Sequence, residues 1–267
     1  MDPVRAECDA RLAALVECAW SLHDRAKSLS WVVRPSIPIL YFGDRSAYLQ
    51  SKPRVISVGL NPSSNEFPQD SRYLRFSAAE SCRSNGTLDI GSYLRALDRY
   101  FYNKPYTTWF RPSFEPVLNG LGASYWCGQG STALHTDLCS PLATSPTWSR
   151  LGRSIRRDFL QHGVSLWHDL VDYLAPDIIL IWVAREHLES LKLKPISRRR
   201  KVRAAGDKSQ YASYWWKAKA GDSFPLIVFG RAAQLPFAFF KNAEKQSIGR
   251  AIRSLLMNAR AHGDSAA

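Results

Sequence analysis

The sequence predicts an α/β protein: a three-layer αβα sandwich around a central four-stranded, mostly parallel sheet. Strand-like and helix-like segments alternate along the chain, which is typical of parallel sheets whose strands are joined by helices. Three of the four strand segments are dense in Val, Ile and Leu, as expected for strands covered on both faces. The 267 residues contain no linker-like break, so we expect one domain over residues 1–267.

Each element is predicted from its hydrophobic period and from the residues that end it. The N-terminal helix, about 4–28, has Leu12, Leu15, Val16 and Trp20 at helical spacing. Further helices are expected at 90–103, 114–121, about 150–174, 185–191 and 237–259. Strands are expected at 55–60, 132–142, 177–183 and 225–230, with a short extended segment at 37–43. Because sites in such folds lie where parallel strands end, the strand exits are the places to search.

The charge and the cysteine content limit the partners. Lys and Arg outnumber Asp and Glu by 36 to 23, a formal charge of +13, which favours DNA as a partner. A basic protein without such a partner is the alternative. The five cysteines include no C-x-x-C motif, so we expect reduced thiols in a cytoplasmic protein, with neither metal nor cofactor. We expect a monomer, and no segment has the pattern of a signal peptide or membrane anchor.

The first predicted strand runs into VISVGLNPSSNEF, residues 55–67. Gly59 allows a close approach of a ligand to the backbone, and Pro62 fixes the amide of Asn61 at the strand end. A simple strand-ending turn is the alternative, since Asn-Pro is common in turns.

Two segments resemble the uracil-DNA glycosylase superfamily. VGLNPS resembles its water-activating motif, which has the form G-[IL]-N-P-G in the mismatch-specific and thymine-DNA branches. LHTDLCSPL, residues 134–142, is similar to its base-recognition strand, where the single-strand-selective branch has N-x-C-P-L. The resemblance covers roughly residues 50–245. It implies base flipping and hydrolysis of an N-glycosidic bond, leaving an abasic site.

The resemblance also implies roles for the residues around the first motif. Asn61 orients the attacking water through its carbonyl oxygen, and Glu66 is a second candidate for water activation or sugar contact. Ser63 and Ser64 are small where the uracil-selective branch has a bulky aromatic, which leaves room at carbon 5 of the pyrimidine. The aromatic that stacks on the flipped base is Tyr73, twelve residues after Asn61, or else Phe76.

Asp137 departs from the superfamily, which usually has Asn at this place. A carboxylate only accepts hydrogen bonds and suits the exocyclic amine of cytosine, whereas Asn suits uracil or thymine. We therefore expect excision of a C5-modified cytosine, such as the glucosylated hydroxymethylcytosine of phage DNA, in antiviral defence. A protonated Asp137 that acts like Asn, in repair of uracil or thymine mispairs, and a general base for another substrate are the alternatives. His135 and Asp137 could share a metal, but no third ligand is nearby.

Contacts with DNA are expected from the basic loop at about 192–208 and from two strand exits. Arg231 replaces the family's histidine as a donor to the base or to phosphate, Gln234 inserts into the stack, and Ser145 binds phosphate. The basic loop supplies Arg198, Arg199, Arg200, Lys201 and Arg203. Two further classes stay open: a non-catalytic nucleic-acid-binding module, and a hydrolase of free nucleosides or nucleotides.

Overall fold

The structure is a computed structural model of the chain. It describes residues 3–84, 86–191, 193–198, 200–202, 213–219, 224–230 and 235–263. The chain forms two compact units. Unit 1 comprises Met1–Ser46, Gly59–Tyr106 and Leu134–Leu174, and unit 2 comprises Ala47–Val58, Thr107–Ala133 and Ala175–Ala267.

The fold class is α/β, as predicted, with five parallel strands in the order β4-β5-β1-β6-β10. Their bounds are β4 (Ala123–Ser124), β5 (Ser131–Asp137), β1 (Val55–Gly59), β6 (Ile178–Ile181) and β10 (Leu226–Phe229). Every residue of β1, β6 and β10 is buried, which confirms that these apolar runs are covered on both faces. The predicted count of four strands is wrong, because β4 has only two residues and shows no hydrophobic pattern.

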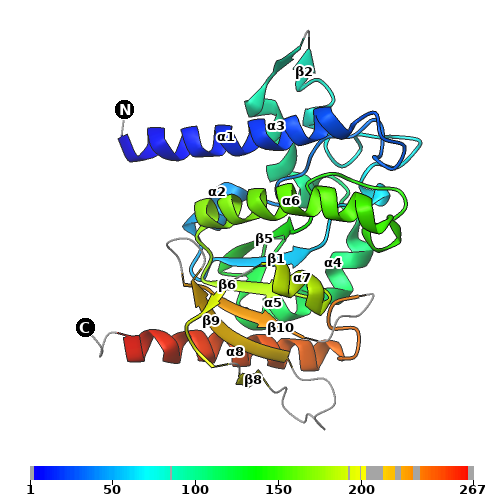
Figure 1. Cartoon of the computed structure of the whole chain (residues 1–267). Coiled ribbons are helices and arrows are strands. Elements are labelled where there is room, and N and C mark those ends of the chain that lie inside the picture. The colour runs from blue at the N-terminus through cyan, green and yellow to red at the C-terminus, as the bar shows by residue number, and fades with distance from the viewer. Residues whose placement is uncertain are drawn as a thin grey trace. The chain divides into compact units, whose positions relative to one another are not determined.

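Helices flank the sheet. The α-helices are α1 (Pro3–Ala26), α2 (Arg45–Gln50), α3 (Ile90–Asp98), α4 (Thr107–Ser113), α5 (Glu115–Leu121), α6 (Arg153–Leu174), α7 (Arg185–Ser190) and α8 (Asn242–Gly263). Short 3₁₀ helices are η1 (Ser64–Glu66), η2 (Ser77–Ala79), η3 (Tyr100–Tyr102) and η4 (Trp148–Arg150). Within unit 1, α1 packs along α6 (Figure 1). No helix among the described residues is long and apolar enough to cross a membrane.

Within unit 2, helices α5 and α8 pack together unusually closely. A Cβ on Gly120 would lie 2.1 Å from the carbonyl oxygen of Gln246, and one on Gly249 would lie 2.1 Å from that of Val117. Only glycine lets the two helix backbones approach this far. Helix α5 then ends at Gly122, whose φ of 82° is the left-handed conformation common at helix ends.

Several segments differ from the prediction, and helix α2 (Arg45–Gln50) is among those that were not predicted. The basic loop at about 192–208 contains two strands, β7 (Lys194–Pro195) and β8 (Arg200–Val202), which pair antiparallel with β9 (Ser213–Lys219). Strand β9 also pairs antiparallel with β10 and so extends the sheet. The last helix begins at Asn242 rather than near 237, because Phe237 has a φ of 56°, outside the helical region. A hairpin of β2 (Arg83–Ser84) and β3 (Thr87–Leu88), and helix α4, were not predicted.

Candidate functional site

The ends of β1 and β5 lie side by side in unit 1, as the sequence predicts. The amide of Leu138 donates to the carbonyl oxygen of Gly59 (3.1 Å), and the amide of Cys139 donates to that of Leu60 (2.7 Å). These bonds continue the pairing of the two chains past the end of each strand. The two motifs that resemble the glycosylase superfamily therefore meet at one edge of the sheet.

Helix α6 fixes which way the side chains of β5 point. The indole Nε1 of Trp167 donates to Oγ1 of Thr136 (3.0 Å), so Thr136 faces α6. Successive side chains on a strand point to opposite faces, and His135 and Asp137 therefore share the other face. A Cβ on Gly163 would lie 1.8 Å from the carbonyl oxygen of Cys139, which shows that α6 lies directly against the end of β5.

Asp137 is buried beside His135 and Gly59. Its side chain is 4 % exposed, and its Oδ1 lies 3.6 Å from Nε2 of His135. A Cβ on Gly59 would lie only 2.6 Å from the same Oδ1, so this position requires glycine for steric reasons. No described residue donates a hydrogen bond to the Asp137 carboxylate. Within the part of the chain that the structure describes, the carboxylate therefore keeps acceptor positions that a ligand could use.

Asn61 is held through its amide nitrogen alone. Nδ2 donates to the carbonyl oxygens of Pro62 (2.9 Å) and Leu142 (3.2 Å). It also donates to Oγ1 of Thr144 (3.0 Å), a fully buried residue. Among the described residues, none donates to Oδ1 of Asn61. The amide is therefore fixed in orientation, with its carbonyl oxygen left to accept a hydrogen bond from water or substrate.

Glu66 is the second buried carboxylate of the site. Its pKa is raised from 4.5 to about 8, mainly by burial and to a smaller extent by the nearby charge of Asp137. The hydroxyl of Tyr100 donates to Oε2 of Glu66 (2.6 Å), and Nε of Arg75 lies 3.9 Å from the same oxygen; both lower the pKa. Glu66 therefore holds its proton at neutral pH, so that Asp137 does not face a second negative charge.

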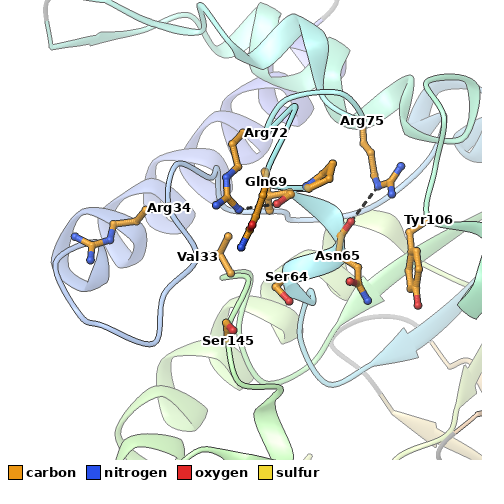
Figure 2. Close-up of a pocket in the computed structure, with 11 residues that line it drawn as sticks. Val33, Arg34, Ser64, Asn65, Gln69, Arg72, Arg75, Tyr106 and Ser145 are labelled. Carbon is orange, nitrogen blue, oxygen red and sulfur yellow. Dashed lines mark hydrogen bonds between the residues drawn. The ribbon is translucent and has the colours of Figure 1, made fainter.

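A pocket of about 420 Å³ lies beside Glu66 in unit 1. Figure 2 shows it between the loop after α1, the segment from η1 to Arg75, and Ser145. Its lining includes Arg34, Ser64, Arg72, Arg75, Tyr106 and Ser145. The predicted residues Ser64 and Ser145 thus come together in one pocket, although 81 residues of chain separate them.

The two candidate stacking aromatics lie elsewhere. Phe76 is fully buried, and its ring stacks on that of Phe67 with centroids 5.4 Å apart, so its faces are occupied by the core. Tyr73 is half-buried and, among the described residues, is not part of the pocket lining. Tyr106 is the aromatic that lines the pocket, with the Arg75 guanidinium 6.0 Å from its ring centroid. The other first-motif serine, Ser63, caps η1 by accepting from the amide of Asn65 (3.2 Å).

The predicted DNA contacts are only partly described. Arg198 and Lys201 are exposed, and Lys201 lies in β8. Arg200 belongs to the same strand, and only its backbone is described. Arg199, Arg203, Arg231 and Gln234 lie outside the described residues. Their predicted roles stay predictions.

Several residues of the site have no sequence signal, or only a weak one. Tyr100 contributes through its hydrogen bond to Glu66, and Thr144 through its hydrogen bond to Asn61. No spacing in the sequence predicts either contact. His135 was considered only as a metal ligand, and among the described residues no group of three His, Cys, Asp or Glu side chains is placed to hold a metal. The alternation of β5 is the one signal that places His135 beside Asp137.

Comparisons with known proteins add no family. Neither the models of known protein families nor the curated proteins yield a match to this chain. The geometry alone therefore has to support a function. It offers a fixed amide oxygen, two buried carboxyl groups of which one is protonated at neutral pH, and an adjoining basic pocket.

Proposed function

We propose that the protein is a monofunctional DNA glycosylase of the uracil-DNA glycosylase type, with that superfamily's three-layer αβα arrangement. It flips a pyrimidine out of DNA and hydrolyses the N-glycosidic bond, leaving an abasic site. The observation that carries the proposal is the anchoring of Asn61, whose Nδ2 has three acceptors while Oδ1 has no donor among the described residues. The charge of +13 supports DNA as the partner of a cytoplasmic monomer.

The chemistry requires a water molecule to reach the anomeric carbon as the base departs. The bond between the sugar and the base nitrogen breaks with its electron pair on the base, and the sugar develops oxocarbenium character. Oδ1 of Asn61 accepts a hydrogen bond from the water and aims it without placing a full charge in the site. Glu66, protonated at neutral pH, contributes a hydrogen-bond donor where an ionised side chain would repel the leaving anion.

Asp137 supports cytosine, with a substituent at carbon 5, as the excised base. Its carboxylate is buried and has no hydrogen-bond donor among the described residues, so the exocyclic amine of cytosine would complete it. Ser64 lines the adjoining pocket and leaves it open to a substituent. Because excision of ordinary cytosine would damage the host genome, a demand for such a modification fits defence against phage DNA. Asp137 in a protonated, Asn-like form would instead favour uracil or thymine mispairs.

A panel of oligonucleotides tests this function. Duplexes and single strands carrying uracil, a thymine mispair, hydroxymethylcytosine or its glucoside are incubated with the protein, and alkali-labile abasic sites are measured. We expect release of the modified cytosine by the wild type and none by Asn61→Ala. Release of uracil alone would overturn the cytosine assignment, and binding without release of any base would indicate a non-catalytic nucleic-acid-binding module.

A further inference from the structure

We propose that the pocket lined by Arg34, Arg72 and Arg75 binds a backbone phosphate of the DNA strand that carries the target nucleotide. This inference rests on the proposed action on DNA, but not on base release. Three guanidinium groups line the pocket, and no described residue of its lining is acidic. Such an excess of positive charge in a concave site favours an anion, and guanidinium groups match the geometry of phosphate oxygens.

Two of the arginines are held in place by the backbone. Arg72 donates through Nη1 to the carbonyl oxygen of Phe67 (2.7 Å), and Arg75 donates through Nε to that of Asn65 (3.2 Å), the bond drawn in Figure 2. Arg75 also donates to the carbonyl oxygen of Lys104. A guanidinium has five N–H donors, so each still has donors for a ligand. A cation that is already ordered loses less conformational entropy on binding.

The neighbouring carboxyl group leaves this charge largely intact. Glu66 is the acidic residue that contacts Arg75, with Oε2 3.9 Å from Nε. Because burial raises the pKa of Glu66 to about 8, the group is mostly neutral at pH 7 and does not cancel the charge of Arg75. An anion in the pocket therefore meets the positive charges of Arg72 and Arg75, while the Arg34 side chain extends away from them in Figure 2.

The pocket is lined by near neighbours in the chain of the residues proposed to act on the base, although Asn61, Glu66 and Asp137 are not themselves part of its lining. Ser64 of the lining and Glu66 belong to the same turn of 3₁₀ helix, η1. Ser145 follows Thr144, the residue whose hydroxyl anchors Asn61. The serine hydroxyls and the arginines surround a space of about 420 Å³, enough for a phosphate with part of its sugar. A phosphate held here would fix the position of the adjoining nucleotide relative to Asn61.

Arg34 is the residue to change, because its loss should not disturb the fold. It is exposed and makes no hydrogen bond or ion pair with a described residue. Arg34→Gln removes one charge from the pocket, and Arg34→Lys keeps the charge. Arg11→Gln is the matched control. Arg11 is exposed on α1, outside the pocket, so this substitution removes the same charge from a different surface.

The measurement is the affinity for an unmodified oligonucleotide over a series of NaCl concentrations. We expect Arg34→Gln to reduce the slope of log K against log salt by about 0.7 for a single strand or about 0.9 for a duplex. Arg34→Lys and Arg11→Gln should keep the wild-type slope. One neutral methylphosphonate linkage beside the target position should weaken binding to the wild type more than to Arg34→Gln, which keeps Arg72 and Arg75.

Inorganic phosphate at constant ionic strength separates the two sources of a phosphate group. If it binds the wild type and not Arg34→Gln, while the DNA slopes are equal, the site takes free phosphate and the DNA assignment is overturned. If the salt slopes of the wild type and Arg34→Gln are equal and the wild type does not bind inorganic phosphate, the proposed phosphate site is overturned. If Arg34→Gln changes the salt slope but the protein releases no base, the phosphate site is supported and the glycosylase proposal is refuted. If the protein releases a base but the slopes of the wild type and Arg34→Gln are equal, the glycosylase proposal is supported and the phosphate site is refuted.

Discussion

Two clusters in this protein contain the same residue types, a glutamate and an asparagine, but their hydrogen bonding differs. In unit 2, Glu115 accepts from the hydroxyl of Ser124 (2.5 Å) and, through its other oxygen, from the amide of Tyr125 (3.2 Å). Asn119, in the amide orientation that satisfies its neighbours, donates to Glu115 (3.1 Å) and to the carbonyl oxygen of Ala123 (3.3 Å). This cluster fastens the end of α5 to the segment that follows it.

In unit 1, the corresponding side-chain oxygens accept no hydrogen bond from a described residue. Oδ1 of Asn61 and Oε1 of Glu66 have no donor among the described residues, and the carboxylate of Asp137 has none either. Burial raises the pKa of both Glu66 and Glu115, so burial alone does not distinguish a functional cluster from a structural one. What differs between the two clusters is that these oxygens of unit 1 accept no hydrogen bond from a described residue, whereas those of unit 2 do.

The largest expected effect is on the rate of base release, which should depend on the side-chain amide of Asn61 but not on that of Asn119. Asn61→Ala should lower the rate of base release by about 10²- to 10⁴-fold, because the attacking water loses the group that orients it. Asn119→Ala should leave that rate unchanged. Single-turnover release from the substrate found in the oligonucleotide panel measures both. If Asn61→Ala and Asn119→Ala lower the release rate equally, the cluster of unit 1 is not functionally different from that of unit 2.

The next effect is on stability as a function of pH. The pKa of Glu66 rises from an ordinary value of 4.5 to about 8 in the folded chain, so the folded state holds a proton that the unfolded state has released. The free energy of unfolding should therefore fall as the pH rises from about 4.5 to about 8, by an amount on the order of a few kcal/mol. Glu66→Gln should lack this component when urea unfolding is compared at about pH 4 and about pH 9, just outside the two limits. Identical pH profiles for the wild type and Glu66→Gln would contradict the raised pKa.

A smaller effect compares the two glutamates at neutral pH. Glu115→Gln should lower the free energy of unfolding by about 1–3 kcal/mol, because the new NH₂ group cannot accept from one of the two donors. Glu66→Gln should instead raise it, by up to a few kcal/mol, because the amide resembles the protonated acid and folding no longer requires uptake of a proton. Denaturant unfolding of both variants tests this. A larger loss at Glu66 would show that its cluster is the structural one.

The smallest effect concerns Tyr100, whose hydroxyl lowers the pKa of Glu66. Tyr100→Phe should raise that pKa and move the alkaline limb of the rate profile to higher pH. The hydroxyl donates to Glu66 and accepts from the amide of Tyr106, so we expect unfolding free energy to fall by about 0.5–1.5 kcal/mol for each of these two hydrogen bonds. An alkaline limb that stays in place would exclude Glu66 as its origin.

The sequence predicted those parts of the molecule that depend on local pattern. The apolar runs of β1, β6 and β10 and the periods of α1 and α6 were identified, and the ends of β1 and β5 meet as the parallel topology requires. Strand β4 was missed because two residues carry no period. Strand β9 lies between the basic loop and the strand predicted at 225–230, where no strand was predicted.

The site was predicted where residues follow a strand end, and not where distant loops meet. Asn61 and Asp137 follow β1 and β5, and their positions could be inferred. Arg34 comes from a different segment than Arg72 and Arg75, and the three share a pocket only in the folded chain. Phe76 was a candidate for stacking on a base, but tertiary packing places it among the aromatic side chains of the core.

Asp137→Asn gives the most direct test of the central claim, that a buried carboxylate without donors selects the base. The quantity to measure is the ratio of release rates for C5-modified cytosine and for uracil in otherwise identical oligonucleotides. We expect the wild type to release the modified cytosine faster than uracil. Asp137→Asn should lower the ratio of the two release rates by about 10- to 100-fold. A ratio that is the same in both proteins would contradict it.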